Sequence, residues 1–417
     1  MNPNLRKVLI ILAFAIVVIG FIFAIWYVFF RSGSAVLTTN TPSGTITNGL
    51  PNAQNGNVNR TRAPRNVNSL PLINAPSTNP TTVANGGATY TDPVTTGSAA
   101  GVNVNPTSGN LQYYDRTTGQ FYSLSPDGLT KTPLTTDTYP DVQNVTWAPN
   151  GNQAILSFPD NSKVLYDFNT KKQTTLPSEL SSFSFSPQSD QLAAKYLDPR
   201  DTENQWLVVS KPDGTQSQSV EHLGANADKV TVNWSPNNQI VAAYAKSVTG
   251  DQQQIIFLGA NDENFPSVDV YGRGFKPNWS PDGRKVLYST YSELTENNPH
   301  LYLMNGSPDS IGTGQLDLGL DTSADKCGFA PSGNTVYCAV PYYYNSGSGP
   351  QPGLSAGIPD NIYKVDLRTG SVTLIARPVD QNKNQRFSAT NVQVAADESS
   401  LFFTDATTGT VQKVQLR

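Results

Sequence analysis

The chain has 417 residues, of which 14% are charged, and its formal net charge at pH 7 is −4. So few charges and a mild acidic excess argue against a surface that follows nucleic-acid phosphates, and we expect no nucleic-acid partner. The two cysteines and two histidines have no further ligands nearby that would complete a metal site. We therefore expect neither a metal nor a cofactor.

An apolar segment near the N-terminus predicts a membrane anchor. Residues 8–30 carry no charged or strongly polar side chain and follow Arg6 and Lys7. A helix of this length spans about 35 Å, enough to cross the roughly 30 Å hydrocarbon layer. A cleaved signal peptide is the alternative, although its apolar core is shorter, about 7–15 residues. Because the positive charges precede the segment, we expect residues 1–7 in the cytoplasm, the helix in the cytoplasmic membrane and the rest outside.

Residues 31–99 are expected to form a disordered linker. Thr, Asn, Pro, Gly, Ser and Ala dominate this stretch, which has no aromatic side chain before Tyr90 and no sustained apolar period. Such a sequence cannot bury enough apolar surface to offset the loss of chain entropy on folding. The linker would let the following domain sample a zone on the order of 45 Å wide above the membrane.

Residues 100–417 contain an internal repeat. An aromatic residue is followed by Ser or Ala, by proline and by a small polar turn, after which a β-rich run begins. The prolines of five copies stand at positions 149, 187, 236, 281 and 331, a spacing that matches the roughly 40–50 residues of a four-stranded propeller blade. The aromatic residues of the repeat are expected to pack between blades: Trp147, Phe185, Trp234, Trp279 and Phe329.

Two weaker copies extend the series in both directions. Residues 105–110 precede a strand-like run, and residues 392–397 show the strand and turn without the aromatic residue or the proline. Counting both, the sequence predicts an all-β fold, a propeller of seven four-stranded antiparallel blades, with six blades as the alternative.

The clearest copy resembles a known repeat family. The run from Trp279 to Tyr288, with the sequence WSPDGRKVLY, and the later run LYLM from Leu301 to Met304 resemble the WD40-like (PD40) repeat of TolB-type β-propellers. Similar repeats form the non-catalytic propellers of prolyl-oligopeptidase-type enzymes. The resemblance implies a protein-binding platform and brings no catalytic residue with it. The chain departs from the TolB family in lacking its separate N-terminal α/β domain, so that family's partner is not assumed.

The only two cysteines, Cys327 and Cys338, fall on the first two strands of one repeat unit. If the hairpin turns between Ser332 and Gly333, the two residues lie directly opposite each other, at a spacing that a cross-strand disulfide can bridge. In an oxidising compartment we expect this disulfide. The alternative is a pair of buried free thiols.

Catalytic motifs are missing from the sequence. It has no Gly-x-Ser-x-Gly elbow, no His-Glu-x-x-His pair, no phosphate-binding glycine loop and no EF-hand loop. His222 and His300 lie beside strands without a local motif, and Asp317, Asp321 and Asp325 have a loop spacing that does not place them on one face. We therefore expect that the protein is not an enzyme. An unrecognised propeller enzyme with acidic residues around the channel is the remaining alternative.

Unequal loop lengths indicate where a partner binds. In a four-stranded propeller, the connections from strand two to three and from strand four to the next blade share one face, here called the long-loop face. Its expected long connections are residues 197–204, 247–252, 291–299, 341–360 and 377–387. Variable loops on a rigid scaffold usually carry recognition.

Tyrosines in the longest of these loops are the main candidate contact residues. Tyr342, Tyr343 and Tyr344 offer broad, stiff, amphipathic surface, and Arg386 and Phe387 are further candidates. In the alternative interpretation, Tyr342 and Tyr344 complete a strand and pack inward. The predicted function is a membrane-anchored scaffold for another protein of the bacterial cell envelope. The alternative is binding of cell-wall or surface carbohydrate by the same face.

Overall fold

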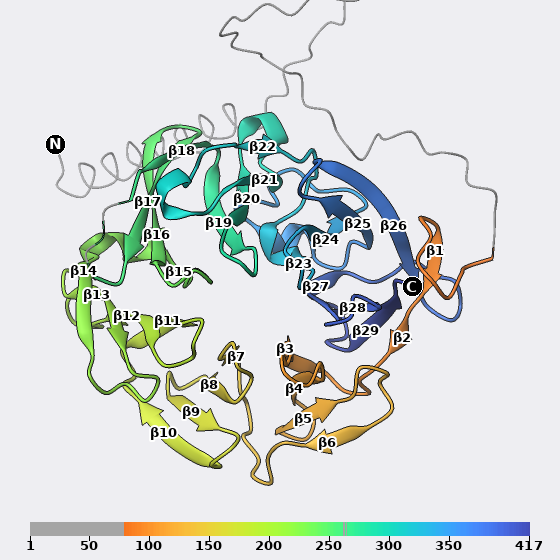
Figure 1. Ribbon diagram of the computed structural model, residues 1–417, viewed down its shortest axis with the longest axis horizontal. Helices are drawn as coiled ribbons and strands as arrows, with labels where there is room; N and C mark the ends of the chain where they lie inside the picture. The colour runs from red at the N-terminus through yellow and green to blue at the C-terminus, as the bar shows by residue number, and fades with distance from the viewer. Residues whose placement is uncertain (1–78, 262, 264) are drawn as a thin grey trace, which may run out of the picture. The chain divides into compact units, whose positions relative to one another are not determined.

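The computed structural model describes residues 79–261, 263 and 265–417. Seven β-sheets follow one another around a central axis in chain order (Figure 1). The predicted propeller of four-stranded antiparallel blades is confirmed, and the number of blades is seven. The predicted membrane segment, residues 8–30, lies outside the described residues. Among the residues described, no helix has the length and apolar character needed to cross a membrane.

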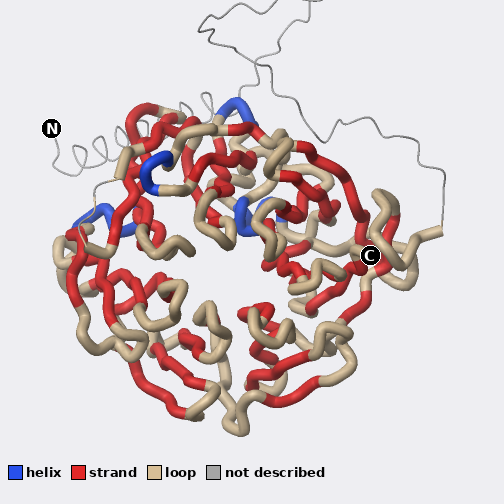
Figure 2. The backbone as a smooth tube through the Cα atoms, viewed as in Figure 1, coloured by secondary structure: helices blue, strands red, loops and turns tan. Residues whose placement is uncertain are grey.

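Each blade runs from an inner strand at the axis to an outer strand at the rim, and the helical elements of the described residues are short 3₁₀ turns (Figure 2). Blade 1 consists of β3 (Ala99–Val104), β4 (Leu111–Asp115), β5 (Gln120–Leu124) and β6 (Lys131–Pro133). Blade 2 consists of β7 (Asn144–Trp147), β8 (Gln153–Ser157), β9 (Lys163–Asp167) and β10 (Lys172–Leu176). Blade 3 consists of β11 (Leu180–Phe185), β12 (Leu192–Leu197), β13 (Gln205–Ser210) and β14 (Gln218–His222). Blade 4 consists of β15 (Val230–Val232), β16 (Ile240–Thr249), β17 (Gln252–Gly259) and β18 (Val268–Tyr271). Blade 5 consists of β19 (Arg273–Trp279), β20 (Lys285–Tyr291), β21 (His300–Asn305) and β22 (Leu316–Asp317).

Blades 6 and 7 contain the C-terminal strands and receive one strand each from the N-terminal side of the domain. Their own strands are β23 (Cys327–Phe329), β24 (Thr335–Pro341), β25 (Asp360–Asp366) and β26 (Ser371–Val379); and β27 (Ala389–Val394), β28 (Ser400–Asp405) and β29 (Val411–Gln415). The 3₁₀ turns are η2 (Gly224–Lys229), η3 (Glu293–Thr295), η4 (Pro308–Ser310), η5 (Ala324–Lys326) and η6 (Pro352–Ser355).

An N-terminal clasp, residues 88–93, closes the ring. Strand β2 (Asp92–Pro93) pairs with β29 and supplies the fourth strand of blade 7, while β1 (Ala88–Tyr90) adds a parallel fifth strand to blade 6 beside β26 (Figure 1). Pro93 fits because an outermost strand has a free edge. The sequence analysis assigned this segment to the linker. Its strands form because the partner strands come from the far end of the chain, which local composition does not reveal.

One pair of backbone hydrogen bonds closes the turn after every inner strand. In blade 5, the Ser280 N–H donates to the Lys285 carbonyl (2.9 Å) and the Gly283 N–H donates to the Ser280 carbonyl (2.8 Å). The same pair recurs in six blades, starting from residues Ala148, Ser186, Ser235, Ser280, Ala330 and Ala395, and blade 1 has a version one residue longer, in which the Gly109 N–H donates to the Asn105 carbonyl. The residue equivalent to Gly283 has a positive φ each time. This explains why the repeat favours Gly or Asn there.

The repeat aromatic residues lie at or just after the ends of the inner strands and pack toward the preceding blade. Trp279 contacts Phe257 of blade 4, with ring centroids 6.4 Å apart. Trp147 contacts Phe121 of blade 1 at 5.6 Å and donates its indole N–H to the Gly101 carbonyl. Phe185, Trp234 and Phe329 belong in the same way to apolar clusters shared with blades 2, 3 and 5.

Inner strands of neighbouring blades also meet directly around the axis. The side-chain amide of Asn278 in blade 5 donates to the Cys327 carbonyl in blade 6 (2.9 Å), and that of Asn391 in blade 7 donates to the Val102 carbonyl in blade 1 (2.7 Å). Between blades 6 and 7 the backbones approach so closely that a Cβ atom at Gly328 would overlap the carbonyl oxygen of Val392.

Replacing Gly328 with alanine should therefore destabilise the propeller. Because the obstructing atom belongs to a backbone, the clash requires the two inner strands to separate, at a cost of about 1–3 kcal/mol. The matched control is Gly250→Ala at the β16–β17 turn, where an added Cβ has no atom within 4 Å. Thermal unfolding measures both variants. Equal melting temperatures for the two would contradict this account of blade packing.

Candidate functional site

The longest insertion on the long-loop face, here called the tyrosine loop, comprises residues 342–359 between β24 and β25 and contains η6. It is attached to the β20–β21 connection of blade 5. The Gly347 N–H donates to the Glu296 carbonyl (2.9 Å), and the Gly349 N–H donates to the Asn297 carbonyl (2.7 Å). The Ser348 N–H also donates to the Asn298 side chain (3.2 Å). These bonds hold the loop in one place before any partner arrives.

The three predicted tyrosines point in different directions. Tyr342 and Tyr343 are 54% and 51% exposed, while Tyr344 is mostly covered. Burial raises the pKa of Tyr344, and the Asp360 carboxylate adds to the effect. Tyr344 therefore packs inward, as one interpretation of the sequence expected. Tyr342 and Tyr343 are exposed, as the other interpretation expected.

Arg386 and Phe387 lie in the connection from β26 to β27. Phe387 is 4% exposed and packs against Phe403, with ring centroids 6.0 Å apart. Arg386 is exposed, pairs with Asp380 (3.1 Å) and lines a cavity of about 470 Å³ beside the clasp. The Phe387 carbonyl accepts from the N–H of Asp360 (2.9 Å), the residue that follows the tyrosine loop, so the backbone of this connection lies beside the end of that loop.

The β16–β17 connection differs from the expected loop of residues 247–252. It is a long hairpin, because Ser247 pairs with Gln253 and Thr249 with Gln252. The hairpin is tied to blade 5 through Asp251, which accepts from the Glu293 N–H (3.0 Å) and pairs with Arg273 (3.2 Å). The long connection of blade 4 is thus bonded to that of blade 5, which in turn is bonded to the tyrosine loop of blade 6.

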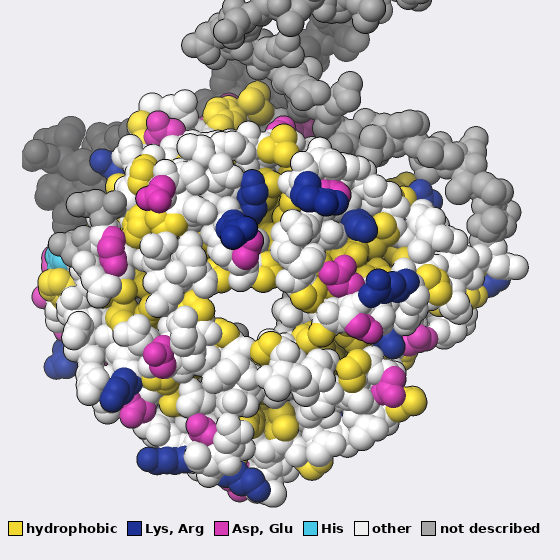
Figure 3. Space-filling model, viewed as in Figure 1, with side chains coloured by type: hydrophobic (Ala, Val, Ile, Leu, Met, Phe, Trp, Pro, Cys, Tyr) yellow, Lys and Arg dark blue, Asp and Glu magenta, His cyan; other side chains and the backbone are white. Residues whose placement is uncertain are grey.

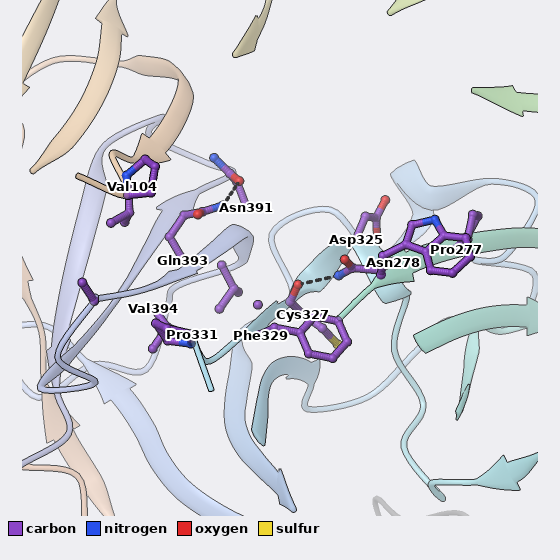
Figure 4. A pocket seen from close by; sticks show the side chains of 15 residues that line it. Val104, Pro277, Asn278, Asp325, Cys327, Phe329, Pro331, Asn391, Gln393 and Val394 are labelled. Carbon is purple, nitrogen blue, oxygen red and sulfur yellow. Dashed lines mark hydrogen bonds between the residues drawn. The ribbon is translucent and has the colours of Figure 1, made fainter. Parts of the chain in front are cut away.

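One cavity adjoins the tyrosine loop, and a second lies beside it at the axis of the ring. The loop cavity, about 570 Å³, lies between this loop, η5 and the ends of β20 and β27. The axial cavity, about 600 Å³, is lined by Trp279, Phe329 and Val394 and by other inner-strand residues (Figure 4). Asp325 and Asn391 line both cavities. The space-filling view shows an opening at the centre of the ring and intermixed charges of both signs around it (Figure 3).

A buried ion pair supports the loop cavity. The Lys326 ammonium contacts both carboxylate oxygens of Asp360, at 2.7 and 2.9 Å, and the Ala389 N–H donates to the same carboxylate (2.6 Å). Asp360 is 1% exposed. Burial raises the pKa of the Asp360 carboxyl, against the lowering effect of Lys326. The group joins η5, β25 and β27, and so fixes blade 6 against blade 7.

Lys326→Met should destabilise the fold by about 3 kcal/mol, because it leaves a buried carboxylate without its cation. Adding Asp360→Asn should recover part of that loss. Lys276→Met is the matched control, since its partner Asp325 (3.2 Å) is exposed and such a pair contributes about 0–1 kcal/mol. Denaturant unfolding gives the three values. Similar losses for the two single variants would rule out a special role for the buried pair.

His300 is held between two carboxylates. Its Nε2 lies 2.7 Å from Asp317 and its Nδ1 lies 2.7 Å from Asp321. Burial alone would lower the pKa of His300, but the hydrogen bonds to the two aspartates outweigh it and raise the pKa to about 9. Two of the three recurring aspartates thus hold a protonated histidine, and Asp325 pairs with Lys276. Within the described part of the chain, no group of three or more His, Cys, Asp or Glu side chains is placed to hold a metal ion.

This arrangement makes stability depend on pH in the alkaline range. The pKa of His300 in the folded protein is raised from 6.5 to about 9. The protonated His300 therefore makes its full contribution to the free energy of unfolding below about pH 6.5, and this contribution is lost as the pH rises through about 9. We expect the free energy of unfolding to fall by on the order of 2–3 kcal/mol across this range. His300→Gln should show a smaller fall in the same denaturant titrations. Parallel pH curves for the two proteins would contradict the assignment.

Cys327 and Cys338 are register partners on β23 and β24, and their sulfur atoms are bonded. Cys327 also lines the axial cavity. The bridge therefore reinforces the inner hairpin of blade 6 at the channel wall.

No family model and no curated protein sequence matches the chain. Solved structures do match its fold. The β-propeller domain of Myceliophteria thermophila Cps50 (Swd1) is 12% identical, with a TM-score of 0.53, covering 78% of this chain and 100% of that one. An oligogalacturonate lyase in complex with manganese is also 12% identical, with a TM-score of 0.51, covering 75% and 87%. At this identity the likeness establishes the β-propeller fold.

The comparison with the lyase corrects one expectation. The lack of catalytic motifs, together with a repeat that forms non-catalytic propellers, predicted that the chain is not an enzyme. That conclusion is wrong as an inference from the fold, since a lyase has the same architecture. Propellers carry both catalysis and binding, so function has to be argued from the site itself.

Proposed function

We propose that the chain is a binding platform of the bacterial cell envelope, anchored in the cytoplasmic membrane by residues 8–30, whose long-loop face binds a partner protein. The apolar N-terminal segment supports the location, and the resemblance of the repeat to TolB-type propellers supports the role. One observation carries the proposal. The tyrosine loop is fixed to the neighbouring blade, yet it leaves Tyr342 and Tyr343 half exposed.

A fixed loop with exposed tyrosines is suited to binding. A loop that is already ordered loses little conformational entropy when a partner docks. Tyrosine supplies a large contact area with few rotatable bonds, and it is enriched among residues that dominate interface energies. Other exposed apolar side chains lie on the linked connections of the same face: Val248, Leu294 and Leu354. They extend the apolar surface on both sides of blade 5.

Replacing Tyr342 and Tyr343 together with serine should abolish capture of the partner by crosslinking in intact cells. Each residue is expected to contribute about 2 kcal/mol, so the affinity should fall by more than about a hundredfold. Thermal stability should not change, because both side chains are exposed. Leu129→Ser is the control, since Leu129 is 85% exposed in the β5–β6 turn on the opposite face. Undiminished capture of the same protein by the tyrosine variant would contradict the proposal, and so would capture of glycan alone by the unmodified protein.

A further inference from the structure

The loop cavity has rigid walls. Tyr291 forms one wall, and its ring fits between two glycines: a Cβ atom at Gly274 or at Gly349 would overlap it. The hydrogen bonds from Gly347 and Gly349 to residues 296 and 297 hold the tyrosine loop against this wall. The volume, about 570 Å³, falls within the range of small-molecule sites. The cavity is therefore formed before a ligand enters it.

Hydroxyl side chains are spread over a lining that is otherwise largely apolar. They come from four separate parts of the chain: Ser289 and Thr290 at the end of β20, Ser323 before η5, Ser348 and Ser355 in the tyrosine loop, and Ser388 and Thr390 at the start of blade 7. Asn391 adds a side-chain amide. Several of these hydroxyls already donate within the protein, as Ser348 does to the Asn345 carbonyl and Thr390 to the Thr404 carbonyl, but their oxygens can still accept hydrogen bonds. A ligand that matches such walls carries many hydrogen-bond donors and also has apolar faces.

The charges at the cavity compensate one another. Lys276 and Asp325 pair at 3.2 Å with side chains 47% and 61% exposed, and Lys326 is neutralised by Asp360. No uncompensated cation is left among these residues to hold a phosphate or a carboxylate. The exposed pair instead places an ammonium donor beside a carboxylate acceptor, which suits two adjacent hydroxyl groups of one ligand.

We propose that the loop cavity is a binding site for a short neutral oligosaccharide. Sugar hydroxyls can donate to the oxygens of the lining, the C–H faces of sugar rings match its apolar surface, and a neutral sugar matches the balanced charges. The site goes beyond the proposed protein partner and does not rest on it. Tyr342 and Tyr343 lie outside the cavity, whereas Tyr344 is part of its lining.

Calorimetric titration of the full chain tests the proposal. The probes are chitotetraose, cellotetraose and maltotetraose, with tetragalacturonate as the anionic comparison. Gly353→Trp is chosen to obstruct the cavity, because Gly353 lines it and an added Cβ there has no atom within 4 Å. Gly250→Trp is the matched control on the same face, with equally open surroundings.

At least one neutral probe should bind with one-to-one stoichiometry and a Kd on the order of 10 μM to 1 mM. Gly353→Trp should weaken this binding about tenfold or more, while Gly250→Trp leaves it unchanged. Asp325→Asn, an exposed substitution, should also weaken it. The variant with Tyr342 and Tyr343 replaced by serine should bind the sugar normally. Loss of sugar binding therefore tests the cavity, and loss of protein capture separately tests the tyrosine loop. Binding of none of the neutral probes, binding that survives Gly353→Trp, or tighter binding of tetragalacturonate would overturn the proposal.

Discussion

Closure of the ring depends on pairing between strands from opposite ends of the propeller domain. Strand β2 completes blade 7 against β29, and the Thr91 N–H donates to the Val379 carbonyl at the end of β26 (3.0 Å). Blades 1 to 5 are sheets of consecutive strands, so the two ends of the domain are joined at blades 6 and 7. With the ring closed, the inner strands stay close enough for amide and carbonyl groups to bridge neighbouring blades around the axis.

The closed ring determines which surfaces can vary. Turns after the inner strands repeat one hydrogen-bond pattern, because each must return the chain within a narrow space beside its neighbours. The opposite face has no such constraint, and there blade 6 carries an insertion of eighteen residues, 342–359. The insertion is ordered because it bonds to the adjacent connection rather than because of its own composition. The long connections therefore gather over blades 4, 5 and 6, where they support one another.

Parts of the candidate site followed from the sequence and parts did not. The position of the tyrosine loop followed, since a long connection between two strands of one blade has to emerge on the long-loop face. Which tyrosines stay exposed did not follow, because Tyr344 is covered by residues far away in the chain. The same limit applies to Lys326 with Asp360 and to His300 with Asp317 and Asp321. No spacing along the chain indicates these groups, since each depends on how separate strands and loops are packed.

The sequence by itself determined the fold class and the opposed placement of Cys327 and Cys338, and it favoured seven blades over six. These features depend on a repeating turn and on hairpins between consecutive strands, so their interactions are local. Only the tertiary structure decided how the ring closes, which loops support one another and where the cavities lie. Those features arise from contacts between segments distant in the chain, as when β2 pairs with β29 or when the tyrosine loop bonds to residues 296–298. Local composition carries no record of such partners, and for that reason the clasp resembled a linker.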